Sequence, residues 1–242
     1  MDELFGAEWL VKDLRDFQLS RDRRHVQLKA SGGDEDHGNR GVVVERKVCL
    51  PVTVPEGRVG GADLNPYLAM AALLAAGANV QAVDMVMSGE TRRAFCAVRP
   101  PGHHAERDRA MGFCIFNNVA VGAAHAMARH GLERVAILDF DVHHGNGTED
   151  IFSGDSRVLF CSTFQHPFYP DRPFVSGNDH IVNVPLPAYT ASRPFREAVT
   201  EHWLPALEAF RPQLVMVSAG FDGHTSDNMS QLMLTNDDFA WL

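Results

Sequence analysis

One stretch of this sequence carries side chains that could bind a metal ion. In residues 134–148, RVAILDFDVHHGNGT, the residues Asp139, Asp141 and His143 alternate after a continuous apolar run. Successive side chains of a strand point to opposite faces, so these three would project to one side if the strand ran through them. Two carboxylates and an imidazole on one face repel and desolvate one another unless a cation lies between them. The alternative is a strand end whose acidic residues are merely solvated.

A second stretch repeats this pattern. Residues 214–218 form another apolar run, and Ala-Gly-Phe-Asp-Gly follows it, which places Asp222 just after a strand. The carboxyl ends of parallel strands meet at one sheet edge, where ligands bind, so Asp141, His143 and Asp222 should come together. Three protein ligands with an open fourth position are typical of catalytic zinc. Because Asp-Gly is common in turns, Asp222 is alternatively only a turn residue.

Two adjacent histidines offer proton chemistry. Arg-Pro-Pro-Gly at residues 99–102 precedes His103 and His104 and restricts the backbone, so both imidazoles can be held in one place. Each can exchange a proton near neutral pH. The alternative is a solvent-exposed histidine pair in a loop. Farther along, Phe113 and Phe116 are on sequence alone more typical of a core than of pocket walls.

Hydrophobic patterning predicts the elements that must position these residues. Strands are expected at 94–98, 135–138, 157–163, 181–184 and 214–218. Helices are expected from the Asn65-Pro66 cap to residue 87, from Asn117 or Asn118 to Gly131, at 147–152, and at 192–210 with a kink at Pro205. Residues 1–65 and 165–172 are predicted to be mostly loop. Strands that alternate with helices indicate an α/β fold with a parallel sheet.

Composition limits the classes of function. With 242 residues, 45% of them hydrophobic, the chain can bury one sizeable core and is predicted to be a single soluble domain. Its formal charge of −9 argues against direct nucleic-acid binding and favours a cationic substrate. No secretory signal is evident and no run approaches the length of a membrane span, so we expect no membrane partner and a cytoplasmic location. The four cysteines form no CxxC pair, and Cys96 and Cys161 lie in apolar runs typical of small core residues.

The motifs RPPGHHA, GFCIFNN, DFDVHHGNGT and SAGFD, in this order and spacing, resemble the histone deacetylase family, particularly its class II-like and bacterial branches. The resemblance runs from about Asp63 to Leu242. It implies the arginase/deacetylase α/β fold, a parallel sheet flanked by helices in a single domain. Residues 1–62 would be a divergent N-terminal segment of that domain, and residues 63–242 an incomplete catalytic domain.

The resemblance also assigns metal sites. Zinc, one ion per chain, falls on Asp141, His143 and Asp222. The family often binds potassium beside the zinc, which here implies a site near Asp139, Asp141, His143 and Ser162.

Catalytic roles follow in the same way. His104 corresponds to the proton acceptor and His103 to its electrostatic partner, which Asp139 would orient. Asn146 sits where some relatives have an aspartate that faces the second histidine.

Gly112, Phe113 and Tyr169 map to the tunnel that holds the acylated side chain, although the position of Tyr169 is commonly phenylalanine. The implied substrate is an acetylated lysine side chain, of histones or other proteins, or an acetylated polyamine. The resemblance leaves the oligomeric state open.

The chain departs from the family at two places. Residues 1–60 match the usual opening poorly, and the sequence stops before the usual Gly-Gly-Tyr loop, whose hydroxyl polarises the amide carbonyl. Tyr67, Tyr169 and Tyr189 lie in no such motif. The chain is therefore expected to be a fragment or a divergent member, and the sequence leaves both open.

The expected activity is zinc-dependent hydrolysis of N-acetyl amides. One alternative is a catalytically weak or silent module that binds zinc and acyl-lysine. Another is the two-manganese chemistry of the related ureohydrolases, but His143-His144-Gly145-Asn146 argues against it because these residues do not supply the bridging carboxylates.

Overall fold

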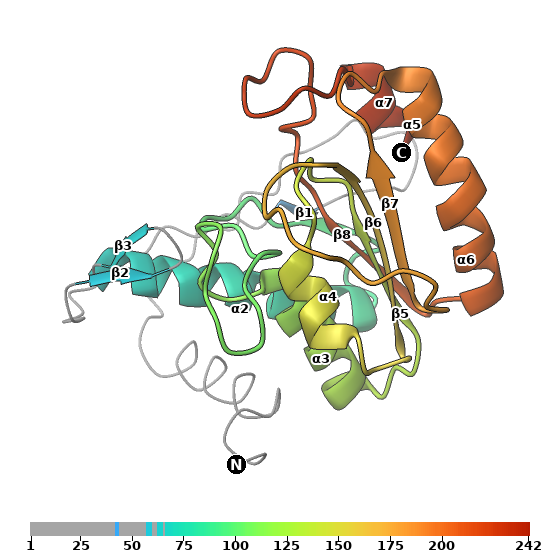
Figure 1. Cartoon of the computed structure of the whole chain (residues 1–242). Coiled ribbons are helices and arrows are strands. Elements are labelled where there is room, and N and C mark those ends of the chain that lie inside the picture. Colours follow the sequence, from blue (N-terminus) through green and yellow to red (C-terminus); the bar gives the residue numbers. More distant parts are fainter. Residues whose placement is uncertain (1–41, 44–56, 60–61, 65) are drawn as a thin grey trace, which may run out of the picture. The chain divides into compact units, whose positions relative to one another are not determined.

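The computed structural model describes residues 42–43, 57–59, 62–64 and 66–242, and the chain divides into two compact units, residues 1–131 and 132–242 (Figure 1). Most of the divergent N-terminal segment, with the predicted cap Asn65, lies outside the described residues. Within the first unit, β1 (Val42–Val43) pairs in parallel with β4 (Ala94–Phe95). β2 (Gly57–Val59) pairs antiparallel with β3 (Ala62–Leu64). β4 is shorter than the predicted strand at 94–98.

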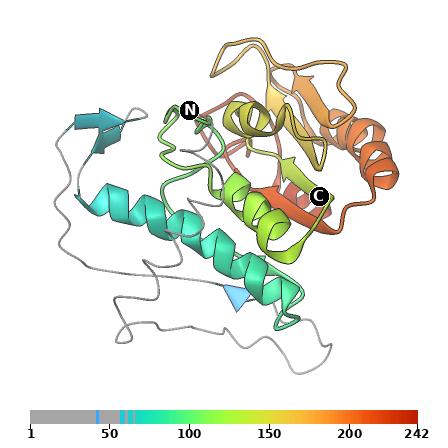
Figure 2. The same ribbon diagram turned by 90° about the horizontal axis from the view of Figure 1, so that it is seen from below.

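The first unit contains two long helices, α2 (Pro66–Met87) and α3 (Asn118–His130), which lie side by side (Figure 2). Asn117 caps α3, because its side chain accepts a hydrogen bond from the backbone N–H of Ala120 at 3.1 Å. Gly131 ends α3 in the left-handed conformation, with φ 67°. The predicted ends of both helices are therefore confirmed, and Asn117 is the cap of the two that the sequence left open.

α2 corrects one expectation. Its segment Tyr67–Met87 has a mean hydropathy of 1.4, long and apolar enough to cross a membrane by length and composition alone. Core helices of soluble proteins share these properties, and half of this window is buried. Ala76 and Val80 of α2 pack with Val121 of α3. The statement that no run approaches the length of a span is therefore wrong, and the cytoplasmic location stays a prediction.

The second unit is built on a four-stranded parallel sheet in the order β7-β6-β5-β8 (Figure 1). Its strands are β5 (Val135–Asp139), β6 (Val158–Gln165), β7 (Ile181–Leu186) and β8 (Leu214–Ser218). The predicted parallel α/β architecture is confirmed. β5 ends at Asp139, which is in register with Ser162 and Ser218. The expected strand alternation through His143 is therefore wrong, because the chain bends after Asp139.

Helices complete the second unit: α4 (Asn146–Phe152), α5 (Ser192–Ala198), the π-helical segment η1 (Val199–Trp203), α6 (Leu204–Phe210) and α7 (Asn236–Trp241). The predicted kink at Pro205 corresponds to η1, where the N–H of Leu204 bonds to the carbonyl of Val199. Pro205 has no N–H, so the regular α-helical ladder cannot continue through it, and a wider turn precedes it. Buried Phe195 and Trp203 of this stretch join the core of the sheet.

Of the two cysteines predicted to lie in the core, Cys161 is buried and Cys96 is only half-buried. Cys161 is fully buried and burial raises the pKa of its thiol to about 12. Burial likewise raises the pKa of Cys96 to about 11. Both thiols are thus protonated at neutral pH, as expected for structural residues.

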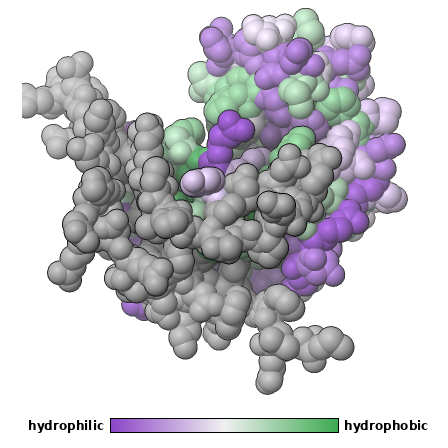
Figure 3. Space-filling model, turned by 90° about the vertical axis from the view of Figure 1, so that its left-hand side faces the viewer, coloured by the Kyte–Doolittle hydropathy of each residue, from purple (hydrophilic) through white to green (hydrophobic). Residues whose placement is uncertain are grey.

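The surface does not by itself reveal a binding face. Hydrophobic and hydrophilic residues are interspersed over the coloured part of the face in Figure 3. Exposed large hydrophobic side chains occur in both units, for example Tyr67 and Phe113 in the first and Tyr189 and Phe221 in the second. The candidate site must therefore be identified from its chemistry.

Candidate active site

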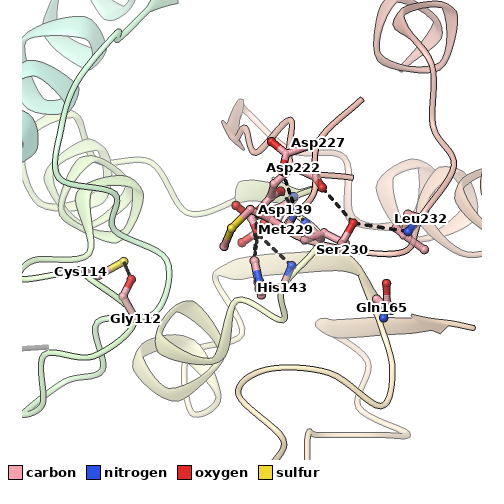
Figure 4. A network of polar contacts seen from close by, with 12 residues as sticks. Gly112, Cys114, Asp139, His143, Gln165, Asp222, Asp227, Met229, Ser230 and Leu232 are labelled. Atoms are coloured by element: carbon pink, nitrogen blue, oxygen red, sulfur yellow. Dashed lines mark hydrogen bonds and ion pairs between the residues drawn. The ribbon is translucent and has the colours of Figure 1, made fainter. Parts of the chain in front are cut away.

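Asp141, His143 and Asp222 form a compact cluster in the second unit. Each offers one ligand atom, and these atoms all lie within 4.8 Å of one another. His143 Nδ1 is 2.9 Å from Asp141 Oδ1 and 3.0 Å from Asp222 Oδ2. Figure 4 shows His143 and Asp222 turned toward each other. The structure thus brings together the three residues that the sequence singled out as metal ligands, and Asp222 is more than a turn residue.

Backbone donors hold this cluster in place. The N–H of Val142 donates to Asp222 Oδ1 at 3.1 Å, which ties the turn after β5 to the loop after β8. The N–H of His143 donates to Asp141 Oδ1 at 2.8 Å. The N–H of Asp141 donates to Asp139 Oδ1 at 3.2 Å. The carboxylates are therefore positioned by the same turn that carries the imidazole.

The electrostatics of the cluster favour a cation. Burial lowers the pKa of His143, but hydrogen bonds and charge interactions with Asp141 and Asp222 outweigh burial and raise it to about 9. The two carboxylates thus favour a positive charge on or beside the His143 imidazole. A divalent ion bound at Nδ1 would supply that charge and neutralise both acids. Two carboxylates and one imidazole suit zinc and leave a fourth position open, so these residues fit the predicted ion.

A second feature suits a monovalent cation. Ser162 Oγ is buried and has no hydrogen-bond partner among the described residues. It belongs to β6, in register with the fully buried carboxylate of Asp139 on β5. A buried polar atom without a partner calls for an explanation, and an ion with oxygen ligands would provide one. The residues present therefore fit the predicted potassium site.

Two aromatic rings lie beside the cluster. Phe168 stacks on the imidazole of His143, with ring centroids 5.2 Å apart and an interplanar angle of 21°. Tyr169 meets the same ring edge-on at 6.0 Å and is 41% exposed. Sequence reasoning selected Tyr169 and missed Phe168. The available signal was its place next to Tyr169 in the same loop.

The histidine pair lies in the first unit. His103 and His104 are each only 5% exposed, and their ring centroids are 4.0 Å apart. The alternative of an exposed histidine pair is therefore wrong. Asn117 Nδ2 donates to the carbonyl of Ala105 at 3.2 Å, so the residue that caps α3 also anchors the chain next to the pair.

Two glycines leave room for site residues. Gly112 has φ +57°, and a Cβ there would lie 2.6 Å from His104 Cγ. A Cβ at Gly220 would lie 2.6 Å from the Cβ of Asp141. The sequence assigned Gly112 to the substrate tunnel, whereas the structure shows it against His104. Gly220 was missed, although its place two residues before Asp222 in the same motif was a signal.

The predicted tunnel residue Phe113 is 61% exposed with φ 62°. The expectation of a core position is therefore wrong for Phe113, whereas Phe116 does pack with the α2–α3 core. Its assignment as a tunnel wall, with Tyr169, stays a prediction.

The central motif also contains buried residues away from the metal cluster. Asn146 is 2% exposed and begins α4. His144 Nε2 lies 3.2 Å from Glu149 Oε2, so this histidine interacts with α4. Burial raises the pKa of Glu149, but the neighbouring His144 and hydrogen bonds from Val175 and Asn183 lower it overall. The roles of Asp139 toward His103 and of Asn146 toward His104 stay predictions.

Comparison with known proteins agrees with the sequence motifs. The model of the histone deacetylase domain matches residues 23–242. A histone deacetylase-like amidohydrolase of Pseudomonas aeruginosa is 43% identical over 187 residues, which are 74% of this chain and 49% of that protein. Human polyamine deacetylase HDAC10 is 38% identical over 77% of this chain and 30% of its own length.

A solved structure agrees as well. The crystal structure of the HDA15 HD domain superposes with a TM-score of 0.71 and 38% identity, over 75% of this chain and 54% of that one. The chain thus spans about half or less of the length of these relatives.

Proposed function

Because the chain belongs to the histone deacetylase family, with the arginase/deacetylase-like α/β fold of that family, we propose that it is a zinc-dependent deacetylase of acetylated lysine side chains or acetylated polyamines. One observation carries the proposal: Asp141, His143 and Asp222 lie within 4.8 Å of one another after two neighbouring parallel strands. Deacetylases of linear amides need such a three-ligand site with room for substrate. The names of the relatives, one a polyamine deacetylase and one an amidohydrolase, support this reaction class.

The chain's own residues would divide the reaction among them. Asp141, His143 and Asp222 would hold a zinc ion, which would supply a Lewis acid and lower the pKa of a bound water from about 15.7 toward 7. We assign His104 to take the proton of the attacking water. His103 or His104 returns a proton to the departing amine, which would otherwise leave as an unstable anion. Burial of both rings suits this role, because it keeps bulk water away from the proton being transferred.

Substrate binding is assigned to Gly112, Phe113 and Tyr169. Apolar rings suit the aliphatic part of an acetylated lysine or polyamine. The net charge of −9 favours substrates that carry further positive charge. A potassium ion near Asp139 and Ser162 is proposed as a structural partner of the zinc site.

The test is hydrolysis by the zinc-loaded chain of two substrates, an acetyl-lysine peptide and an acetylated polyamine. We expect acetate release that is lost in His143→Ala and retained in Asp227→Ala, which changes an exposed aspartate of the loop that carries Asp222. Release of acetate by His143→Ala at the native rate would refute the proposal. The ratio of the two rates identifies the preferred substrate class.

A second candidate is binding of zinc and acyl-lysine with little or no turnover. Tight binding of a hydroxamate without acetate release, on one zinc-loaded sample, would identify this candidate.

A further inference from the structure

A second group of metal-ligating side chains lies in the first unit, where α2 meets α3. Asp84, the single charged residue of α2, has its Oδ1 atom 2.6 Å from His125 Nε2 and 2.8 Å from His130 Nε2. We propose that Asp84, His125 and His130 bind a second divalent transition-metal ion, independent of the Asp141–His143–Asp222 cluster.

The donor set and its spacing suit such an ion. The three ligand atoms lie within 4.8 Å of one another. In tetrahedral zinc with bonds of about 2.0–2.1 Å, the ligand atoms are about 3.3 Å apart. The contacts of Asp84 Oδ1 with His125 and His130, now 2.6 and 2.8 Å, would therefore lengthen by roughly 0.5–0.7 Å. Two imidazoles and one carboxylate favour zinc, cobalt or nickel over magnesium or calcium, which prefer oxygen ligands. Asp84 is 47% exposed, which leaves a fourth position accessible to water.

Two features of the buried histidine and its partner point to more than a hydrogen bond. His125 is fully buried, and its Nδ1 atom has no hydrogen-bond partner among the described residues. Its contact with Asp84 is thus made through Nε2, which donates to the ionised carboxylate, and a metal ion bound at Nε2 would take the place of that proton. Burial raises the pKa of Asp84, but hydrogen bonds and charge interactions with both histidines lower it overall. The carboxylate is therefore ionised, as a metal ligand must be.

The helix geometry favours positive charge at the same place. Asp84 lies in the last turn of α2, and His130 is the last residue of α3 before the Gly131 cap. The carboxyl end of a helix carries partial negative charge, so a cation there is stabilised. A metal ion would add a link near the ends of two helices that also pack through Ala76, Val80 and Val121.

The experiment counts metal ions in the full chain. Metal-free protein is titrated with zinc, and with cobalt for its visible absorption spectrum, in the native sequence and in His143→Ala, which lacks the first site. We expect two equivalents in the native chain and one in His143→Ala. Adding Asp84→Asn or His130→Gln to His143→Ala should lower the affinity of the remaining site for zinc at least tenfold. These variants avoid the fully buried His125, whose replacement could prevent folding.

Two controls in the His143→Ala background separate this site from incidental binding. His202→Gln removes an exposed histidine outside the cluster, and Arg129→Gln changes the exposed neighbour of His130. Both control variants should still bind one equivalent of zinc. Zinc should raise the melting temperature of the two control variants but not that of the double variant His143→Ala, His130→Gln. The proposal is overturned if folded His143→Ala binds no zinc, or if it binds one equivalent that Asp84→Asn and His130→Gln do not weaken. In either case the contact of Asp84 with the two histidines is only a hydrogen-bonded link between α2 and α3.

Discussion

At the scale of single residues, His143 is the side chain on which the metal centre depends. Its Nδ1 atom contacts two carboxylates, its backbone N–H donates to Asp141, and Phe168 covers its ring. These contacts restrain the imidazole from several directions. The cluster is therefore prepared for a cation before one binds.

We expect Asp141→Ala, His143→Ala and Asp222→Ala each to lose zinc while the chain still folds. Removing one of three ligands leaves too few for tight binding. Metal content after dialysis, measured beside Asp227→Ala, checks this result. Full zinc occupancy in any of the three ligand variants would show that the residue is not a ligand.

His104→Ala should keep its zinc but lose roughly 10²- to 10⁴-fold in rate, the usual contribution of a positioned acid or base. His103→Ala should lose less. Rates at saturating acetyl-lysine peptide, together with metal content, make the comparison. An unchanged rate in His104→Ala would reassign the proton acceptor.

Two glycine variants should distinguish zinc binding from proton transfer. Gly220→Ala places a methyl group against Asp141, so zinc content should fall. Gly112→Ala crowds the ring of His104 instead, so activity should fall while zinc content stays unchanged. Parallel measurement of zinc content and rate tests both outcomes. Equal zinc loss in the two variants would contradict the distinction.

At the scale of elements, short irregular segments position the chemistry and regular ones support them. The turn after β5 carries Asp141 and His143, and the loop after β8 carries Asp222, the three proposed metal ligands. Farther along, α7 is fastened by Asp238, a fully buried carboxylate that completes a capping box with Thr235. Asp238 also accepts hydrogen bonds from Ser192 at 2.7 Å and from Arg196 at 2.8 Å, which attach α7 to α5.

Asp238→Asn should destabilise the chain at pH 7 by about 1–3 kcal/mol, the range for leaving buried partners unsatisfied. Burial raises the pKa of Asp238, but its hydrogen bonds lower it below the ordinary value of 3.8. The contribution of the Asp238 carboxylate to the free energy of unfolding is thus fully present above about pH 3.8 and is lost as pH falls through the lower, folded-state pKa. Urea unfolding at several pH values should show the difference between native and variant shrinking below pH 3.8.

The exposed neighbour Asp237 supplies the matched control for this measurement. Asp237→Asn should change the free energy of unfolding by less than about 0.5 kcal/mol at any of these pH values. An equal loss of stability in both variants would mean that helix charge, and not the buried network, is responsible.

At the scale of the whole molecule, β8 has one strand neighbour, β5, in the part of the chain that the structure describes. Val215 and Val217 are 48% and 51% exposed on this strand. Edge strands with exposed apolar side chains promote association. We therefore expect concentration-dependent self-association, measured by light scattering, that Val215→Lys reduces. The control variant Leu204→Lys, at an exposed position on α6, should leave self-association unchanged. Equal effects of the two variants would argue that β8 is not the contact surface.

The sequence by itself determined which segments become helices and strands and which residues can bind metal. Pro66, the Asn117 cap and Gly131 act on their immediate neighbours, so the helix ends could be predicted from local preferences. The grouping of Asp141, His143 and Asp222 could also be predicted, because carboxyl ends of parallel strands meet at one edge whatever the details of packing.

Tertiary structure decided where local signals compete or distant residues meet. The N–H of Phe140 still bonds to Ser218 of β8, but the next two backbone N–H groups, those of Asp141 and Val142, bond to carboxylates and the strand ends, which alternation alone does not reveal. The close approach of Gly220 to Asp141 follows from the pairing of strands far apart in sequence. The contact of Asp84 with two histidines, 41 and 46 residues away, exists only because α2 packs on α3. Such contacts depend on which surfaces face each other, and that information is carried by the whole core and not by a motif.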